Sequence, residues 1–264
     1  MAYFFRGHER EWVNIDEDES RERTSIEDLD ALIVSGKIPP VAAIMPGLCS
    51  IDNKTHSLGI NMMGNLPEPR AGLGTGRFWD FLTLELIPYI EARYGKWLQN
   101  GKRLTAGFSL GGYTASMLAA GLPGYFDDVG IYDGLHMYDS QIDIRTGEKD
   151  TIWCESPVFD AALGKPEDRT AQALRYWNPT ELIKNADPVT YHELSETTFW
   201  VRSAAADGNK GNLERTRYFV DLLRDSGITA GFNRVAFHSE AEHTWHWNDR
   251  FLRLFLLNAL DDIR

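Results

Sequence analysis

A serine between two glycines, in the segment GFSLG at residues 107–111, is the pattern in this chain with the clearest chemical meaning. A short apolar run precedes it, and residues 113–120 are small enough for a tightly packed helix. A G-x-S-x-G sequence between a strand and a helix favours the sharp turn called a nucleophile elbow, which lifts the serine oxygen out of the sheet. We therefore predict that Ser109 is a nucleophile for acyl transfer.

A serine hydroxyl is nearly unreactive at neutral pH unless a base and a residue that orients the base accompany it. Asp207 lies in the loop after a predicted strand at 198–203. His243 follows a predicted strand at 231–237 and precedes a predicted terminal helix at 247–260. The order serine, acid, histidine is the one that elbow-bearing enzymes use. We predict a catalytic triad of Ser109, Asp207 and His243.

Two of these three positions have a competing residue. Asp207 stands before Gly-Asn, a typical turn sequence, and Asp133, directly after a predicted strand at 128–132, is the alternative acid. His246 competes with His243. We favour His243 because a loop ahead of the helix can aim its ring at Ser109, whereas His246 falls in the first helical turn.

Several separated segments resemble the esterase family typified by esterase D, feruloyl esterases and the mycobacterial mycolyltransferases. Residues 29–46 are similar to its helix, glycine turn and next strand, residues 81–91 to its helix before the elbow, and residues 243–245 to its histidine motif. The resemblance implies a three-layer α/β-hydrolase fold, with a mostly parallel sheet between helices. It also implies a serine hydrolase that cleaves carboxylic esters through an acyl-enzyme.

The same resemblance identifies an oxyanion loop in the segment YFFRGH at residues 3–8. The implied donors are the backbone N–H groups of His8 and of Leu110, which directly follows the serine. Two donors aimed at the developing negative oxygen are a large electrostatic contribution to acyl transfer. Arg6 departs from the family, which more often has histidine or aspartate at this position.

Apolar runs alternate with helical stretches along the chain, as expected for a parallel sheet covered on both faces. We predict one domain over residues 1–264, with an irregular, cap-like insertion at about 134–197. The predicted strands lie near 2–5, 41–46, 103–107, 128–132, 198–203 and 231–237, and the predicted helices near 25–35, 76–94, 110–121, 211–226 and 247–260. Residues 141–153 are expected to form a hairpin around Thr-Gly.

The insertion carries aromatic residues that could decide which substrate binds. We name His136, Trp153 and Trp177 as candidates for a pocket wall. The same side chains could instead form the small core of the insertion itself, and the sequence leaves both interpretations open.

Family members usually have two more strands ahead of the oxyanion strand, which begins here at residue 2. We expect that first hairpin to be missing, through a late start or natural trimming, so that the strand at 41–45 becomes a sheet edge. An apolar edge invites pairing with another chain. A homodimer is therefore expected.

A formal net charge of -12 argues against nucleic acid or an anionic membrane as partner, because both require basic patches. The acidic run at 16–19 is expected to be a solvated loop, since it lacks the ligand spacing of a calcium site. No metal or organic cofactor is implied. The absence of a leader or a long apolar segment favours the cytoplasm, although an upstream start would change that.

Two alternatives to a small-molecule ester hydrolase stay open. An acyltransferase uses the same residues but passes the acyl group to an alcohol, and a non-catalytic binding protein would keep the fold alone. Turnover of simple esters by the wild type would separate the hydrolase and the acyltransferase from the non-catalytic binding protein.

Overall fold

The computed structural model covers all 264 residues of the chain. It describes residues 1–7, 9–50, 56–62, 75–98, 101–150, 159, 162–164, 167, 169–206 and 212–261. No helix within these ranges is long and apolar enough to cross a membrane.

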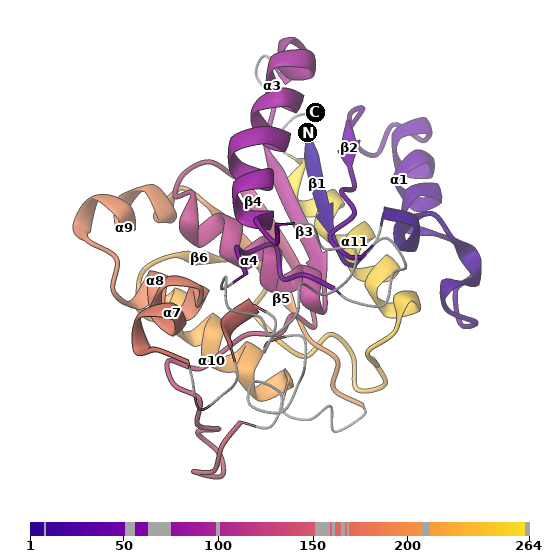
Figure 1. Ribbon diagram of the computed structural model, residues 1–264. Coiled ribbons are helices and arrows are strands. Elements are labelled where there is room, and N and C mark those ends of the chain that lie inside the picture. The colour runs from indigo at the N-terminus through magenta and orange to yellow at the C-terminus, as the bar shows by residue number, and fades with distance from the viewer. Residues whose placement is uncertain are drawn as a thin grey trace.

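A six-stranded parallel sheet forms the centre of the described structure, in the order β2-β1-β3-β4-β5-β6. Its strands are β1 (Ala2–Phe5), β2 (Ala43–Ile44), β3 (Leu104–Phe108), β4 (Asp128–Tyr132), β5 (Thr198–Arg202) and β6 (Thr229–Ala230). Because the strands are parallel, their carboxyl ends share one edge, at the bottom of Figure 1, where the segment after β4 also lies. Loops that leave this edge can meet.

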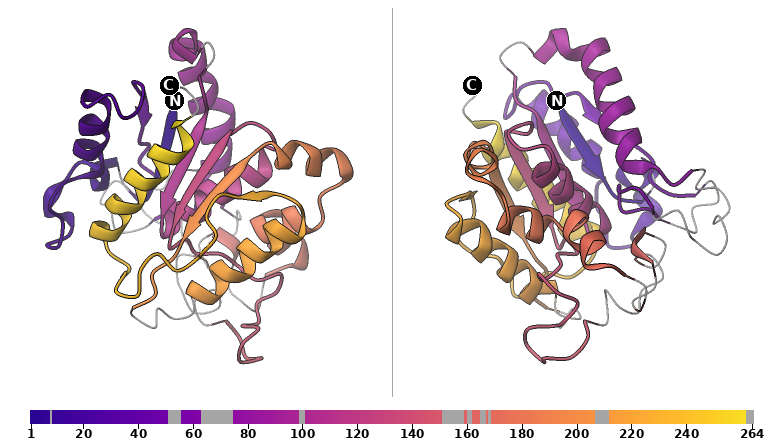
Figure 2. Two further views of the ribbon diagram at one scale, coloured as in Figure 1. Left: turned by 180° about the vertical axis from the view of Figure 1, so that it is seen from behind. Right: turned by 60° about the vertical axis from the view of Figure 1, so that its left-hand side comes forward.

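Helices cover both faces of the sheet, as Figures 1 and 2 show. Alternate side chains of β1 point to opposite faces: Tyr3 and Phe5 pack in one apolar cluster, Ala2 and Phe4 in another. The first cluster includes side chains of α3 (Ile87–Tyr94), α4 (Leu110–Gly121) and α10 (Asn212–Asp225). The second includes side chains of α1 (Ser25–Val34) and α11 (Trp245–Ala259). This arrangement confirms the predicted α/β class.

Local sequence signals explain where the first helix begins and ends. Thr24 and Glu27 form a reciprocal capping box at the start of α1. Gly36, with φ of 67°, ends the helix in the left-handed region, where glycine is favoured. The predicted helix at 76–94 is instead three consecutive pieces: α2 (Phe78–Asp80), a π-helical stretch (Phe81–Leu86) and α3. Short 3₁₀ helices occupy Glu9–Trp12, Ile15–Glu17 and Gly95–Leu98.

The last predicted strand is wrong in position. The sheet ends with β6 at 229–230, and the predicted strand at 231–237 makes only a single bridge, between Ala236 and Ser203. The backbone at Gly231 crowds the ring of Trp200, where even a Cβ atom would lie 2.4 Å away. The N–H of Gly231 still donates to the carbonyl of Phe199 at 2.8 Å; beyond it the chain leaves the ladder and returns to the end of β5 at Ala236.

The insertion after β4 is less irregular than predicted. Its second half forms α7 (Ala171–Tyr176), α8 (Pro179–Lys184) and α9 (Pro188–Ser195), which follow the N-cap residues Thr170, Asn178 and Asp187. The expected hairpin is present as an antiparallel bridge between Ile142 and Lys149, with Gly147 in the turn at φ of 74°.

Candidate active site

Ser109 occupies a strained turn between β3 and α4. Its φ of 57° and ψ of -117° lie outside the regions that residues with a side chain normally adopt. Its N–H donates to the carbonyl of Tyr132 at 3.1 Å, and its carbonyl accepts from Leu135 N at 3.3 Å. The backbone around the end of β4 thus holds the elbow in place, and strain of this kind is found at functional sites.

The glycines around Ser109 are required by close contact between backbones. A Cβ at Gly107 would lie 2.0 Å from the carbonyl oxygen of Gly111, and a Cβ at Gly111 would lie 1.7 Å from that of Phe5. Only glycine allows α4 to begin so close to both β1 and β3. This confirms the predicted sharp turn between strand and helix at Ser109.

His243 lies beside the elbow with one ring nitrogen held by a carboxylate. Its Nδ1 lies 2.5 Å from Oδ2 of Asp133, and its ring centroid lies 4.7 Å from that of Phe108, the residue before Ser109. Because Asp133 occupies Nδ1, Nε2 is the histidine nitrogen left for proton transfer. The His243 side chain is 31% exposed, whereas that of Asp133 is fully buried.

Several donors converge on Asp133 besides His243. Ser203 Oγ and the backbone N–H of Ala204, at 3.1 Å, donate to Oδ1, and Asn212 Nδ2 donates to Oδ2 at 3.3 Å. Burial on its own would raise the pKa of Asp133, but the hydrogen bond and charge of His243, with the other side-chain donors, hold the pKa below its ordinary value. The carboxylate is therefore ionised and can stabilise an imidazolium.

The loop that carries His243 is fixed at both ends. The hydroxyl of Tyr132 donates to the carbonyl of Glu242 at 2.6 Å, and the backbone N–H of Trp245 donates to Oδ2 of Asp18 at 2.7 Å. Asp18 belongs to the acidic run expected to be a solvated loop. Its neighbours Asp16, Glu17 and Glu19 are exposed, but Asp18 caps α11. The prediction is therefore wrong for this one residue.

The structure favours the second of the two candidate acids. Asp207 lies outside the described residues, so its own position is not tested, whereas Asp133 occupies the place beside His243 Nδ1 that the triad acid requires. Asp133 also has a positive φ, 45°, and its N–H donates to the carbonyl of Arg202 at 2.8 Å. This turn at the end of β4 directs its side chain toward the histidine loop.

Of the two predicted oxyanion donors, the structure describes one. Leu110 is the first residue of α4, so its N–H has no acceptor within the helix and is available beside Ser109. His8 lies outside the described residues, and its role stays a prediction.

Two of the three predicted pocket-wall residues are described, and both are buried, so a role in substrate binding stays a prediction. His136 is fully buried, stacks on Phe219 at 4.2 Å between centroids, and burial lowers its pKa to about 3. Trp177 packs beside Trp79 in an apolar cluster that includes Leu110. Both side chains are therefore part of the buried packing of the insertion against the rest of the protein. Trp153 lies outside the described residues.

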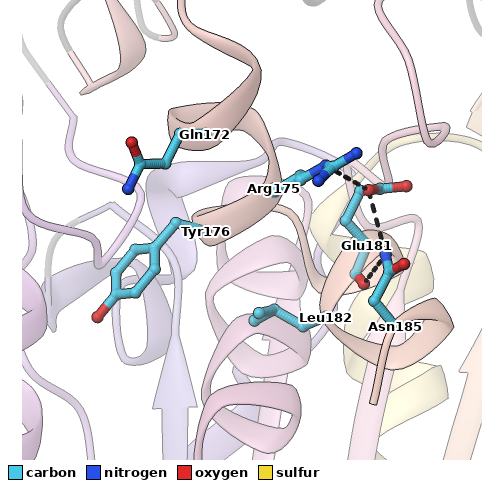
Figure 3. A pocket seen from close by; sticks show the side chains of 6 residues that line it. All are labelled: Gln172, Arg175, Tyr176, Glu181, Leu182 and Asn185. Carbon is cyan, nitrogen blue, oxygen red and sulfur yellow. Dashed lines mark hydrogen bonds and ion pairs between the residues drawn. The ribbon is translucent and has the colours of Figure 1, made fainter. Parts of the chain in front are cut away.

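A surface hollow of about 430 Å³ lies elsewhere on the insertion, between α7 and α8 (Figure 3). Its lining residues are Gln172, Arg175, Tyr176, Glu181, Leu182 and Asn185. Neither Ser109 nor His243 is among them, so the hollow is separate from the elbow. No three His, Cys, Asp or Glu side chains in the described part of the chain gather closely enough to hold a metal ion.

The parallel sheet, the elbow at the end of β3 and the histidine and aspartate beside it are the arrangement that serine hydrolases of the α/β-hydrolase fold share. A family model described as "Putative esterase" matches residues 21–254. The chain belongs to this esterase family and is a carboxylic ester hydrolase. A comparison with curated protein sequences finds no match.

Solved structures share the fold at low sequence identity. A ferulic acid esterase aligns with a TM-score of 0.66 and 16% identity, over 98% of this chain and 84% of its own. An S-formylglutathione hydrolase from Agrobacterium tumefaciens gives 0.61 and 14%, over 98% and 83%. FphF, a fluorophosphonate-binding serine hydrolase of Staphylococcus aureus, gives 0.63 and 13%, over 98% and 82%. Each likeness shows the fold.

Proposed function

We propose that the chain hydrolyses carboxylic esters through an acyl-enzyme on Ser109, with His243 as the proton carrier and Asp133 as the residue that orients it. The observation that carries this proposal is the 2.5 Å contact between His243 Nδ1 and Asp133 Oδ2, beside a serine held at φ of 57°. A buried carboxylate on Nδ1 selects the tautomer whose Nε2 can accept a proton.

The proposed reaction has two halves. In the first, Ser109 Oγ attacks the ester carbonyl while its proton passes to His243 Nε2. The tetrahedral intermediate then collapses, and the alcohol leaves with that proton. In the second, water attacks the acyl-enzyme, gives its proton to Nε2, and the carboxylic acid is released as Ser109 regains a proton. The N–H groups of Leu110 and of His8 would hold the negative oxygen in both halves.

The geometry at Ser109 is compatible with this chemistry. The Ser109 hydroxyl makes no hydrogen bond to another described residue. Catalytic hydrogen bonds often tighten only when substrate is bound. The side chain of His243 is 31% exposed and Ser109 is 5% exposed, so solvent reaches both residues.

The test is hydrolysis of p-nitrophenyl esters of increasing acyl length by the wild type and by Ser109→Ala. We expect Ser109→Ala to lower kcat by about 10⁴-fold or more, because the triad acts as a unit. Intact mass after brief exposure to a fluorophosphonate should show one adduct on the wild type and none on Ser109→Ala.

Ser239→Ala is the matched control, since Ser239 is an exposed serine on the loop that leads to His243. It should keep both the turnover and the adduct. Ester turnover that survives Ser109→Ala would contradict the proposed mechanism. Transfer of the acyl group to an added alcohol, in preference to water, would identify an acyltransferase.

A further inference from the structure

Arg6 follows β1 directly, its backbone nitrogen lies beside Gly111 of the elbow, and its side chain contacts the same aromatic ring as the proposed catalytic histidine. Its Cζ lies 5.1 Å from the centroid of the Phe108 ring, and the His243 ring lies 4.7 Å from the same centroid. Phe108 itself is buried, as are Tyr132 and Trp245, which also contact its ring. Among these neighbours of Phe108, Arg6 and His243 are the two that solvent reaches, at 18% and 31% of the side chain.

The charge of Arg6 is poorly compensated by the protein. Its Nε is buried and has no hydrogen-bond partner among the described residues, and the rest of its guanidinium makes no hydrogen bond to them either. The nearest carboxylate oxygen, Oε1 of Glu11, is 3.7 Å from Nε. The other oxygen of Glu11 accepts a hydrogen bond from Gly7 N at 2.7 Å. Arg6 therefore keeps a full set of donors that the described part of the fold does not use.

A guanidinium in this condition favours an anionic ligand. Burial lowers the pKa of Arg6, with Glu11 and Glu17 opposing that effect, but arginine stays charged in proteins. A partly buried cation without hydrogen-bonded partners is costly. A carboxylate that bound the guanidinium through two parallel hydrogen bonds would remove that cost. In a chain of net charge -12, a positive group beside the site also attracts anions that the rest of the surface repels.

We propose that Arg6 binds a carboxylate group of the substrate, so that the enzyme prefers esters bearing a negative charge a few bonds from the scissile carbonyl. This inference rests on the proposed function, because it places the substrate at Ser109. The carboxylate can belong to the acyl part or to the alcohol part of the ester, and both use the same recognition by the guanidinium.

The test compares a charged ester with a neutral ester of the same carbon skeleton in the wild type and in Arg6→Gln. In the acyl arm, p-nitrophenyl hemiglutarate is paired with p-nitrophenyl pentanoate. In the alcohol arm, 4-carboxyphenyl butanoate is paired with 4-methylphenyl butanoate. In at least one arm, Arg6→Gln should lower kcat/KM for the charged ester at least about tenfold more than for the neutral one, as loss of a charge-assisted hydrogen bond implies.

Two controls separate charge recognition from general damage. Arg217→Gln removes the same charge from an exposed position on α10, where Arg217 is 49% exposed, and should change neither ratio. Arg6→Lys keeps the charge but loses the planar pair of donors, so it should retain part of the preference. Equal losses for charged and neutral esters in both arms would overturn the proposal and leave Arg6 a structural role.

A binding measurement makes the outcome independent of turnover. In the Ser109→Ala background, calorimetry with monomethyl glutarate and with 4-carboxyphenyl butanoate should give a Kd at least about tenfold weaker for at least one of them when Arg6→Gln is added. An unchanged Kd for both would overturn the Arg6 proposal even if esterase activity were established. Conversely, Arg6-dependent binding without ester turnover would contradict the proposed function alone.

Discussion

At the scale of single residues, the decisive feature is which carboxylate reaches the histidine. Asp133 comes directly after β4, and its backbone turns at a positive φ, so that the side chain points away from the strand and toward His243. Its oxygens also accept hydrogen bonds from residues at the end of β5 and the start of α10. Such convergence of donors on one buried carboxylate is what a triad acid requires, because its charge must be stabilised without access to water.

Replacement of each candidate acid by asparagine tests this assignment directly. We expect Asp133→Asn to lower kcat by about 10³- to 10⁴-fold, because an amide no longer selects the productive tautomer of His243. Asp207→Asn should leave kcat within a few-fold of the wild type. Initial rates with one p-nitrophenyl ester measure both variants. The opposite result, a severe loss in Asp207→Asn alone, would return the role to Asp207.

At the scale of elements, the histidine loop depends on a cap supplied from far away in the sequence. α11 begins at Trp245, and its preceding residue, Thr244, makes no side-chain cap. Asp18 accepts the Trp245 N–H instead. The hydrogen bonds from Ser20, Trp245 and His246 outweigh the effect of burial and lower the pKa of Asp18. A carboxylate there also suits the positive end of the helix.

Removal of this cap should affect catalysis as well as stability. We expect Asp18→Ala to lower the free energy of unfolding by about 1 kcal/mol, and to reduce kcat with little change in KM, because the His243 ring loses part of its positioning. Asp18→Asn should recover most of both. Urea unfolding and steady-state kinetics give the two readouts.

Glu19→Ala is the control for Asp18→Ala, since Glu19 belongs to the same acidic run and is exposed. If Glu19→Ala matched Asp18→Ala in both readouts, the effect would come from the charge of the run and not from the cap.

The elements with strong local signals could be predicted from the sequence, and those set by contacts could not. The elbow is visible because a strand, two glycines and small helical residues coincide around Ser109. The helices α8 and α9 also had a readable signal, since Asn178-Pro179 and Asp187-Pro188 each pair a capping residue with proline at the first helical position.

Other features depend on long-range geometry that no local pattern contains. Asp133 and Asp207 both follow predicted strands, so their order along the chain agrees equally well with a triad. The choice depends on the positive φ of Asp133 and on donors such as Asn212, which is 79 residues away in sequence. The packing of Gly231 against the Trp200 ring at the end of β6 is likewise a contact between separate strands.

At the scale of the whole molecule, the sheet has an edge at β2. This strand is the last in the order on the side of β1, as predicted, and both of its residues are only partly buried. Its neighbour Ala42 is exposed. An edge of this kind presents backbone donors and acceptors that another strand can use.

We propose that a second copy of the chain covers this edge in a two-fold dimer. Light scattering at micromolar concentration should give the mass of a dimer for the wild type. Ala42→Lys should shift the mass toward that of a monomer, because a lysine on an edge strand opposes pairing. Lys37→Ala, in the exposed turn before the strand, should leave the mass unchanged. A wild-type monomer would show that the edge needs no partner.

The strained backbone of Ser109 implies that the nucleophile lowers the thermal stability of the protein. Glycine adopts a φ of 57° with a ψ of -117° without the steric cost that serine and alanine both incur there, which is of order 1–3 kcal/mol. Ser109→Gly and Ser109→Ala should therefore be equally inactive, yet Ser109→Gly should melt about 2 to 12 °C higher. The difference in calorimetric Tm between these two inactive variants would measure the thermal stability that the strained backbone costs the active enzyme. Selection for thermal stability alone would then favour glycine at position 109, where activity requires serine.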